Sequence, residues 1–221
     1  MATRLLPNSR GGAIHYDYSE LKAFLKGIRA NVACGHSGHY GGVEGKLLHD
    51  ITRPSPTLSG ETPYKILEIG MNAGHSAWVF LTAAPHVHVT SVDIGYYAHT
   101  RQVADWFAER FPGRHRLLLG KSQQVLLEPE VTTTGGYDAA FIDGAHSYKA
   151  ANLDLQNVRK LLRPGGLLIM DDVGNPAEMS SLARWHKGPT KAWYEAVSAG
   201  GIEEVGHDWN VKVAWGRYFP S

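Results

Sequence analysis

The sequence predicts an α/β fold in which helices flank a doubly wound, mostly parallel sheet. From residue 64 to residue 171, short apolar runs alternate with amphipathic helical stretches, a rhythm typical of parallel sheets. Two of these runs, AAFI at 139–142 and LLIM at 167–170, are apolar throughout, as expected for strands covered on both faces. The last part, GIEEVGHDWNVKVAWGRYF, reads as two strands joined by a tight turn near residues 207–210, which predicts a C-terminal antiparallel hairpin.

The first 60 residues lack the alternation of strands and helices that begins at residue 64. We predict that residues 1–60 form a helical cap on a main domain of residues 61–221. A helix is expected at 18–30, a glycine-rich loop at 34–42 and a short helix at 43–51. In the main domain we expect strands at 64–69, 86–93, 115–120, 137–143 and 165–171, and helices at 75–84, 97–111, 122–128 and 147–162.

Composition narrows the classes of partner and compartment. Of the 221 residues, 43% are hydrophobic and 19% are charged, which is typical of a folded globular chain. The net charge is +1 without a long basic run, so we expect no nucleic-acid partner. With neither a secretory signal nor a membrane-length apolar run in the sequence, and a single cysteine, we expect a cytoplasmic protein without membrane contact and leave homo-oligomers open.

The most informative stretch is YKILEIGMNAGHS, residues 64–76, where an apolar strand is followed by a glycine loop and a helix. This order is typical of a nucleotide site, because glycine lets the backbone approach a ligand closely. The loop has the spacing GxxxG at Gly70 and Gly74 instead of GxGxxG, which makes a pyrophosphate-binding loop less favoured. Glu68 at the strand tip suits a ribose and a cationic amino-acid tail better than a pyrophosphate, which favours S-adenosylmethionine; the alternative is a carboxylate that only caps local amides.

Two further strand ends add groups for the same cofactor. The second strand ends at Asp93, about 20 residues after the glycine loop, where a carboxylate can accept both ribose hydroxyls. A solvated turn aspartate is the alternative there. The third strand is followed by Lys121, Ser122 and Gln123, short polar groups that suit the edge of an adenine, and we assign Ser122 to cofactor binding.

Carboxylates follow the fourth and fifth strands. Asp143, Asp171 and Asp172 would place three negative charges at one rim if the two strands are neighbours, because neighbouring strands lie about 5 Å apart. A hard divalent cation would relieve their repulsion, and oxygen ligands favour Mg²⁺ over zinc. Loop-capping aspartates are the alternative. Asp143 is also assigned to the catalytic and cofactor-binding groups, and His146, three residues later, is either a general base or a structural histidine.

Four segments together resemble the class I S-adenosylmethionine-dependent methyltransferases: LEIGMNAGHS, SVDIG, YDAAFIDGAHSY and LLRPGGLLIMDDV. More narrowly, the chain resembles metal-dependent small-molecule O-methyltransferases with an IDGxHxY motif. The resemblance covers about residues 62–172 and implies a Rossmann-like methyltransferase fold, with the terminal hairpin as its antiparallel end.

The resemblance also implies residue roles. Asp93 would hold the ribose, His146 would be the base, and Asp143, Asp171 and Asp172 match positions that carry Mg²⁺ in the metal-dependent members. Asn72 stands where the family's first motif commonly has its middle glycine. The methionine end of the cofactor would be held by Glu68, Gly70, Asn72, Gly74 and Ser76.

The sequence thus predicts a Mg²⁺-assisted transfer of a methyl group from S-adenosylmethionine to a hydroxyl of a catechol-, phenol- or sugar-like molecule. One alternative keeps the fold and cofactor but acts without metal, using His146 as the base on oxygen or nitrogen. Another is a nicotinamide-dependent oxidoreductase, which is disfavoured by the GxxxG loop.

Overall fold

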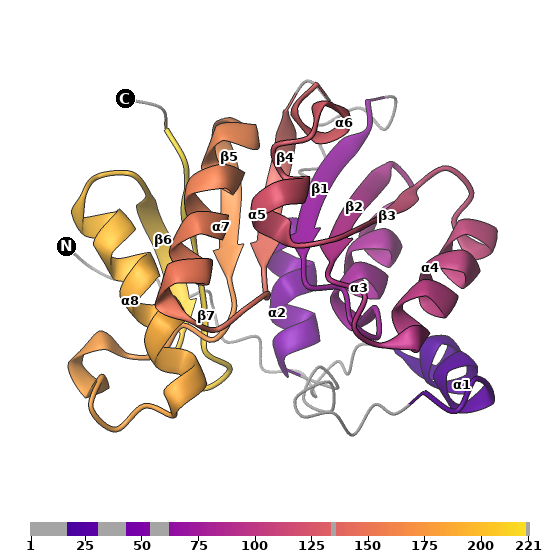
Figure 1. The fold of residues 1–221 in the computed structure, drawn as a ribbon, viewed down its shortest axis with the longest axis horizontal. Helices are drawn as coiled ribbons and strands as arrows, with labels where there is room; N and C mark the ends of the chain where they lie inside the picture. The colour runs from indigo at the N-terminus through magenta and orange to yellow at the C-terminus, as the bar shows by residue number, and fades with distance from the viewer. Residues whose placement is uncertain (1–16, 31–42, 54–61, 134–135, 220–221) are drawn as a thin grey trace. The chain divides into compact units, whose positions relative to one another are not determined.

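The computed structural model describes residues 17–30, 43–53, 62–133 and 136–219, so the loop predicted at 34–42 lies outside the described residues. The described residues fall into two compact units, one within Gly12–Lys121 and one within Ser122–Ser221. Each unit combines strands with helices (Figure 1), and together the strands confirm the predicted doubly wound, mostly parallel α/β class. In the described part of the chain, no helix has both the length and the apolar character needed to cross a bilayer.

The unit within Gly12–Lys121 contains three parallel strands in the order β3-β2-β1. Tyr64 is paired with Val87 at the start of β1, and Val89 with His115 at the start of β3. All three predicted strands are confirmed to within about one residue at each end. The elements are α1 (Ser19–Gly27), α2 (Val43–Thr52), β1 (Tyr64–Ile69), α3 (His75–Ala83), β2 (Val87–Asp93), α4 (Ala98–Arg110) and β3 (His115–Leu119).

Helix α1 is attached to this unit by an aromatic contact and a hydrogen bond. Phe24 stacks on Trp106 of α4 with ring centroids 4.7 Å apart, and Trp78 Nε1 of α3 donates to the Asp17 carbonyl at 3.0 Å. Both helices predicted for the N-terminal section are therefore present, while their role as a separate cap stays a prediction.

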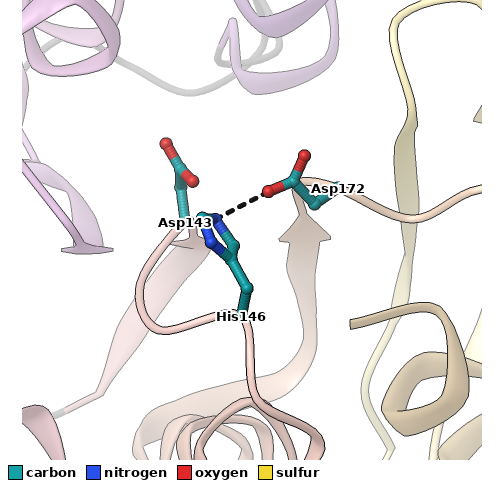
Figure 2. A group of neighbouring side chains, drawn as sticks. All are labelled: Asp143, His146 and Asp172. Atoms are coloured by element: carbon teal, nitrogen blue, oxygen red, sulfur yellow. Dashed lines mark ion pairs between the residues drawn. The ribbon is translucent and has the colours of Figure 1, made fainter. Parts of the chain in front are cut away.

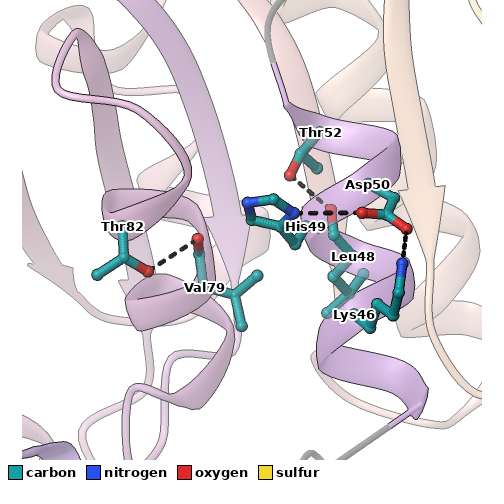
Figure 3. A network of polar contacts seen from close by, with 7 residues as sticks. All are labelled: Lys46, Leu48, His49, Asp50, Thr52, Val79 and Thr82. Carbon is teal, nitrogen blue, oxygen red and sulfur yellow. Dashed lines mark hydrogen bonds and ion pairs between the residues drawn. The ribbon is translucent and has the colours of Figure 1, made fainter. Parts of the chain in front are cut away.

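Helix α2 is amphipathic and packs beside α3 (Figure 3). Leu48 is fully buried, whereas Lys46 and Asp50 form an exposed ion pair one turn apart. Near its C-terminal end, Thr52 Oγ1 donates to the Leu48 carbonyl at 2.6 Å and so satisfies its own buried hydroxyl. One face of this helix is therefore buried, while the charged side chains of Lys46 and Asp50 lie on the exposed side.

The unit within Ser122–Ser221 contains four strands in the order β4-β5-β7-β6. β4 and β5 are parallel, β7 runs antiparallel to β5, and β6 runs antiparallel to β7, so the predicted C-terminal hairpin is confirmed. Its turn lies at 209–212, slightly later than expected. The elements are α5 (Ser122–Val125), α6 (Pro129–Thr132), β4 (Tyr137–Ile142), α7 (Tyr148–Leu161), β5 (Leu162–Met170), η1 (Pro176–Glu178), α8 (Arg184–Ser198), β6 (Glu203–Asp208) and β7 (Val213–Arg217).

The helix predicted at 122–128 differs from what the structure contains. Helix α5 ends at Val125, and α6 begins anew at Pro129. Glu128 between them is extended, with φ −70° and ψ 144°. The residue before a proline is pushed out of the helical region by the proline ring, so Pro129 separates the two short helices.

Helix α8 lies very close to the loop that joins β4 to α7. A Cβ atom at Gly188 would lie 2.2 Å from the His146 carbonyl oxygen and 2.6 Å from the Tyr148 nitrogen. Only glycine permits this approach. Farther along the helix, Trp193 is fully buried and its Nε1 donates to Glu204 of β6 at 2.7 Å. Helix α8 is therefore a fixed part of the unit and sets the position of the loop around His146.

Gly188→Ala should destabilise the protein by about 1–3 kcal/mol or more, because the new methyl group would overlap backbone atoms that have no room to move. Gly27→Ala is the matched control, since a Cβ atom there meets nothing within 4 Å. It should be neutral or slightly stabilising. Urea unfolding measures both, and equal free energies of unfolding for the two variants would contradict this packing.

Candidate active site

The glycine loop after β1 depends on three residues in the left-handed region of the backbone. Gly70 has φ 91°, Asn72 has φ 46° and Gly74 has φ 77°. Asparagine is among the few residues that adopt this region readily, which explains how Asn72 replaces a glycine. At Gly74 a Cβ atom would also lie 2.7 Å from Val103 Cγ1, so α4 packs directly against the loop.

Asp93 and His99 hold this loop in place. Asp93 Oδ2 accepts the backbone N–H of Asn72 at 2.9 Å, and Asp93 Oδ1 accepts the N–H of Gly95 at 2.7 Å. His99 Nε2 donates to Asn72 Oδ1 at 2.8 Å, and burial lowers the pKa of His99. The structure thus brings Asp93 to the glycine loop and gives it a role in shaping that loop. Its contact with a ribose stays a prediction.

Glu68 lies behind the loop rather than on its surface. The residue is fully buried, Ser76 Oγ donates to its Oε1 at 2.5 Å, and Ser91 Oγ donates to its Oε2 at 2.5 Å. Burial raises the pKa of Glu68 to about 7, while the two hydroxyls oppose that shift. Glu68 and Ser76 therefore meet, but they meet each other, and their contact with the methionine end of a cofactor stays a prediction.

Glu68→Gln should remove a pH dependence of stability. Because the folded pKa of about 7 lies above the ordinary value of 4.5, the contribution of Glu68 is greatest below pH 4.5 and is lost as the pH rises to 7. At about 1.4 kcal/mol per pKa unit, Glu68→Gln should gain roughly 2.5 kcal/mol over the wild type between pH 5 and pH 8. Urea unfolding at both values tests this, with exposed Glu109→Gln as control. Parallel pH profiles for wild type and Glu68→Gln would contradict it.

Ser122, the residue expected at the adenine edge, is bound to a buried carboxylate that the sequence did not single out. Its Oγ donates to Asp154 Oδ1 of α7 at 2.7 Å, and Gln123 Nε2 donates to the same oxygen at 2.8 Å. The side chains of Ser122 and Gln123 therefore have a defined orientation before any ligand binds.

Asp143, His146 and Asp172 form a cluster beyond the ends of β4 and β5 (Figure 2). Asp143 directly follows β4, His146 lies in the loop before α7, and Asp172 lies just past β5. One potential ligand atom from each residue lies within 4.8 Å of the other two. Of the three aspartates predicted to hold a metal, the structure brings two together and places His146 with them, while Asp171 lies outside this group.

The position of Asp172 requires an unusual backbone. Its φ is 60°, a region that aspartate tolerates better than most residues. The flanking chain is fixed on both sides, since the Asp171 N–H donates to the Ile142 carbonyl at 3.0 Å and the Val173 N–H donates to the Lys212 carbonyl at 2.7 Å. Two residues on, the Gly174 N–H donates to Thr190 Oγ1 of α8 at 2.9 Å. These bonds hold the backbone on both sides of Asp172.

Two imidazoles flank the Asp172 carboxylate. His146 Nε2 lies 2.7 Å from Oδ2, and His186 Nδ1 of α8 lies 2.8 Å from Oδ1. The hydrogen bond to Asp172 raises the pKa of His146, whereas burial lowers the pKa of His186 despite the same carboxylate. Asp172 thus stabilises the protonated form of His146, whereas His186 favours the neutral form.

His186 and His99 are the residues of these two clusters that the sequence did not reveal. His186 belongs to a segment, 174–200, whose pattern predicts only a loop and a helix, and the close packing at Gly188 is what brings it to Asp172. A glycine and a proline at 188 and 189, inside a helical pattern, were the one available sign of close backbone approach there.

Comparison with known families identifies part of the chain. Residues 67–173 match the family model described as a methyltransferase domain. This part of the chain is similar to a methyltransferase domain. The match includes the glycine loop, Asp93 and the Asp143–His146–Asp172 cluster, so the nicotinamide alternative has no further support.

The curated proteins that this chain resembles are much longer. Tenellin synthetase of Beauveria bassiana is 26% identical over 140 residues, which are 60% of this chain and 3% of that protein. The hybrid PKS-NRPS synthetase iccA of Talaromyces variabilis is 26% identical over 142 residues, 61% of this chain and 3% of that protein. The chain thus spans only a few hundredths of the length of these relatives.

Solved structures share the fold over nearly the whole chain. A Podospora anserina methyltransferase bound to S-adenosylhomocysteine (SAH) has a TM-score of 0.69 at 16% identity, covering 98% of this chain and 99% of its own. An O-methyltransferase of Bacillus cereus in complex with SAH has a TM-score of 0.68 at 19% identity, covering 91% and 92%. An O-methyltransferase of Streptomyces achromogenes, involved in tomaymycin synthesis and bound to S-adenosylmethionine, has a TM-score of 0.67 at 16% identity, covering 94% and 92%. The fold is the Rossmann-like methyltransferase fold that the sequence predicts.

Proposed function

We propose that this chain is an S-adenosylmethionine-dependent O-methyltransferase that methylates a hydroxyl of a catechol-, phenol- or sugar-like small molecule with the help of Mg²⁺. The observation that carries the proposal is the Asp143–His146–Asp172 cluster, which combines two carboxylates and an imidazole within a methyltransferase domain. The cofactor is supported by the glycine loop and by solved structures of the same fold that contain S-adenosylmethionine or SAH.

The cluster fits a divalent cation. Ligand atoms bound at about 2.1 Å to one Mg²⁺ lie up to about 4.2 Å apart, and the candidate ligand atoms of the cluster all lie within 4.8 Å of one another. Asp143 and Asp172 would hold the ion, with Asp171 as the further predicted carboxylate. When bound, the ion supplies positive charge that lowers the pKa of a neighbouring hydroxyl.

His146 is the group placed to take the proton of the acceptor hydroxyl. An imidazole accepts a proton only in its neutral form, and Asp172 stabilises the charged form of His146. The charge at Asp172 therefore sets how much of the base is available near neutral pH. S-adenosylmethionine supplies an electrophilic methyl group, and transfer requires the acceptor oxygen to be held within about 3 Å of it.

The contact between His146 and Asp172 favours a second candidate, the same reaction without metal. In that case Asp172 orients the imidazole through the 2.7 Å contact and stabilises the imidazolium that forms when the proton is taken. The acceptor atom is then an oxygen or a nitrogen that needs no cation to become nucleophilic.

Chelation separates the two candidates. A panel of catechols, phenols and sugar glycosides, with SAH formation as the readout, should yield a substrate whose turnover is lost in EDTA and restored by Mg²⁺. Asp172→Asn keeps a residue that tolerates φ 60° but removes the charge, so kcat/KM should fall about 100-fold or more.

Asp105→Asn, the same change on the exposed face of α4, is the matched control and should leave kcat/KM unchanged. Calorimetry with SAH shows that each variant is folded and binds the cofactor product. Full turnover in EDTA would refute the metal-assisted reaction and leave the second candidate, and full activity of Asp172→Asn would refute both.

A further inference from the structure

Asp154 is a buried carboxylate that the proposed reaction does not use. It lies in the middle of α7, is 0% exposed, and faces the short helix α5. Its Oδ1 accepts from Ser122 Oγ at 2.7 Å and from Gln123 Nε2 at 2.8 Å, while no described residue bonds to its Oδ2. A carboxylate buried in this way is costly to the fold, so its two bonds to α5 need an explanation.

Helix α5 depends on such an anchor for its geometry. It has only four residues, far fewer than a helix needs to be stable by itself. The Ser122 carbonyl accepts the Leu126 N–H at 2.9 Å, and Leu126 is buried. Packing at Leu126 and hydrogen bonding to Asp154 together fix the orientation of the Ser122 and Gln123 side chains.

The bonds also determine which way round the Gln123 amide lies. Both hydrogens of Nε2 are used, one toward Ser122 Oγ at 2.8 Å and one toward Asp154 Oδ1. An amide oxygen in that position would face a carboxylate oxygen and be repelled. A proton on Asp154, whose pKa burial raises, would sit on the unbonded Oδ2 and leave this arrangement unchanged. Gln123 Oε1 is therefore the end of the amide that remains to accept a hydrogen bond from a ligand.

We propose that Asp154 is a positioning residue that makes Gln123 present a hydrogen-bond acceptor to the nucleobase of the cofactor and so selects adenine. The 6-amino group of adenine is a donor and matches Gln123 Oε1. Hypoxanthine has a carbonyl oxygen at the same position, which would leave two acceptors facing each other. The inference rests on the proposed function, since it takes the nucleoside of S-adenosylmethionine as the ligand next to Ser122 and Gln123.

Calorimetry with SAH and with S-inosylhomocysteine tests the assignment. Wild type should bind SAH at least about tenfold more tightly. Asp154→Ala should lose about tenfold in affinity for SAH, lose most of its preference for adenine, and raise KM for S-adenosylmethionine with kcat little changed. Asp154→Asn should stay within about twofold of the wild type in all of these, because its Oδ1 still accepts both bonds.

Gln123→Leu keeps the test decisive if Asp154→Ala does not fold. It removes the amide from a half-buried position while Asp154 and Ser122 stay paired, and it should bind the two ligands with equal affinity. Three outcomes would overturn this inference but not the proposed function. Gln123→Leu could keep the preference for adenine, or a folded Asp154→Ala could bind both ligands as the wild type does. The wild type itself could also bind both ligands with equal affinity. Failure of the wild type to bind SAH would overturn the proposed function and this inference with it.

Discussion

The candidate active site depends on one carboxylate, Asp172, held between two imidazoles. His146 and His186 approach opposite oxygens of this group, and they come from different elements, the loop before α7 and the helix α8. Asp172 raises the pKa of His146, whereas burial lowers the pKa of His186. The carboxylate therefore stabilises the protonated form of His146, while His186 favours the neutral form. The charge at Asp172 thus controls both candidate chemistries, cation binding and proton acceptance.

Packing within the unit of Ser122–Ser221 holds Asp172 and the two imidazoles in place. Asp172 adopts φ 60° within a segment held by Ile142, Lys212 and Thr190, and backbone conformations of this kind persist only where the surroundings impose them. Gly188 allows α8 to contact the loop at His146, which brings His186 within reach. In the other unit, Asn72 and the two glycines of the loop adopt comparable left-handed conformations, and Asp93 accepts hydrogen bonds from two backbone amides there.

The sequence predicts the strands and most helices because alternating apolar runs and turn residues are local signals. It also places Asp143, His146 and Asp172 near one rim, because the carboxyl ends of parallel strands gather polar groups. It does not predict the left-handed backbone at Asp172, the residue that joins Asp143 and His146 in the cluster. Nor does it predict His186 or Asp154, whose roles come from helix packing between segments distant in sequence.

The most direct test of the central claim is a crystal structure of the protein grown with SAH and Mn²⁺, with anomalous diffraction to locate the ion. We expect an anomalous peak bonded to Asp143 and Asp172, with His146 beside it. A peak elsewhere would contradict the role given to this carboxylate, as would Asp172 remaining bonded only to its two imidazoles at saturating Mn²⁺.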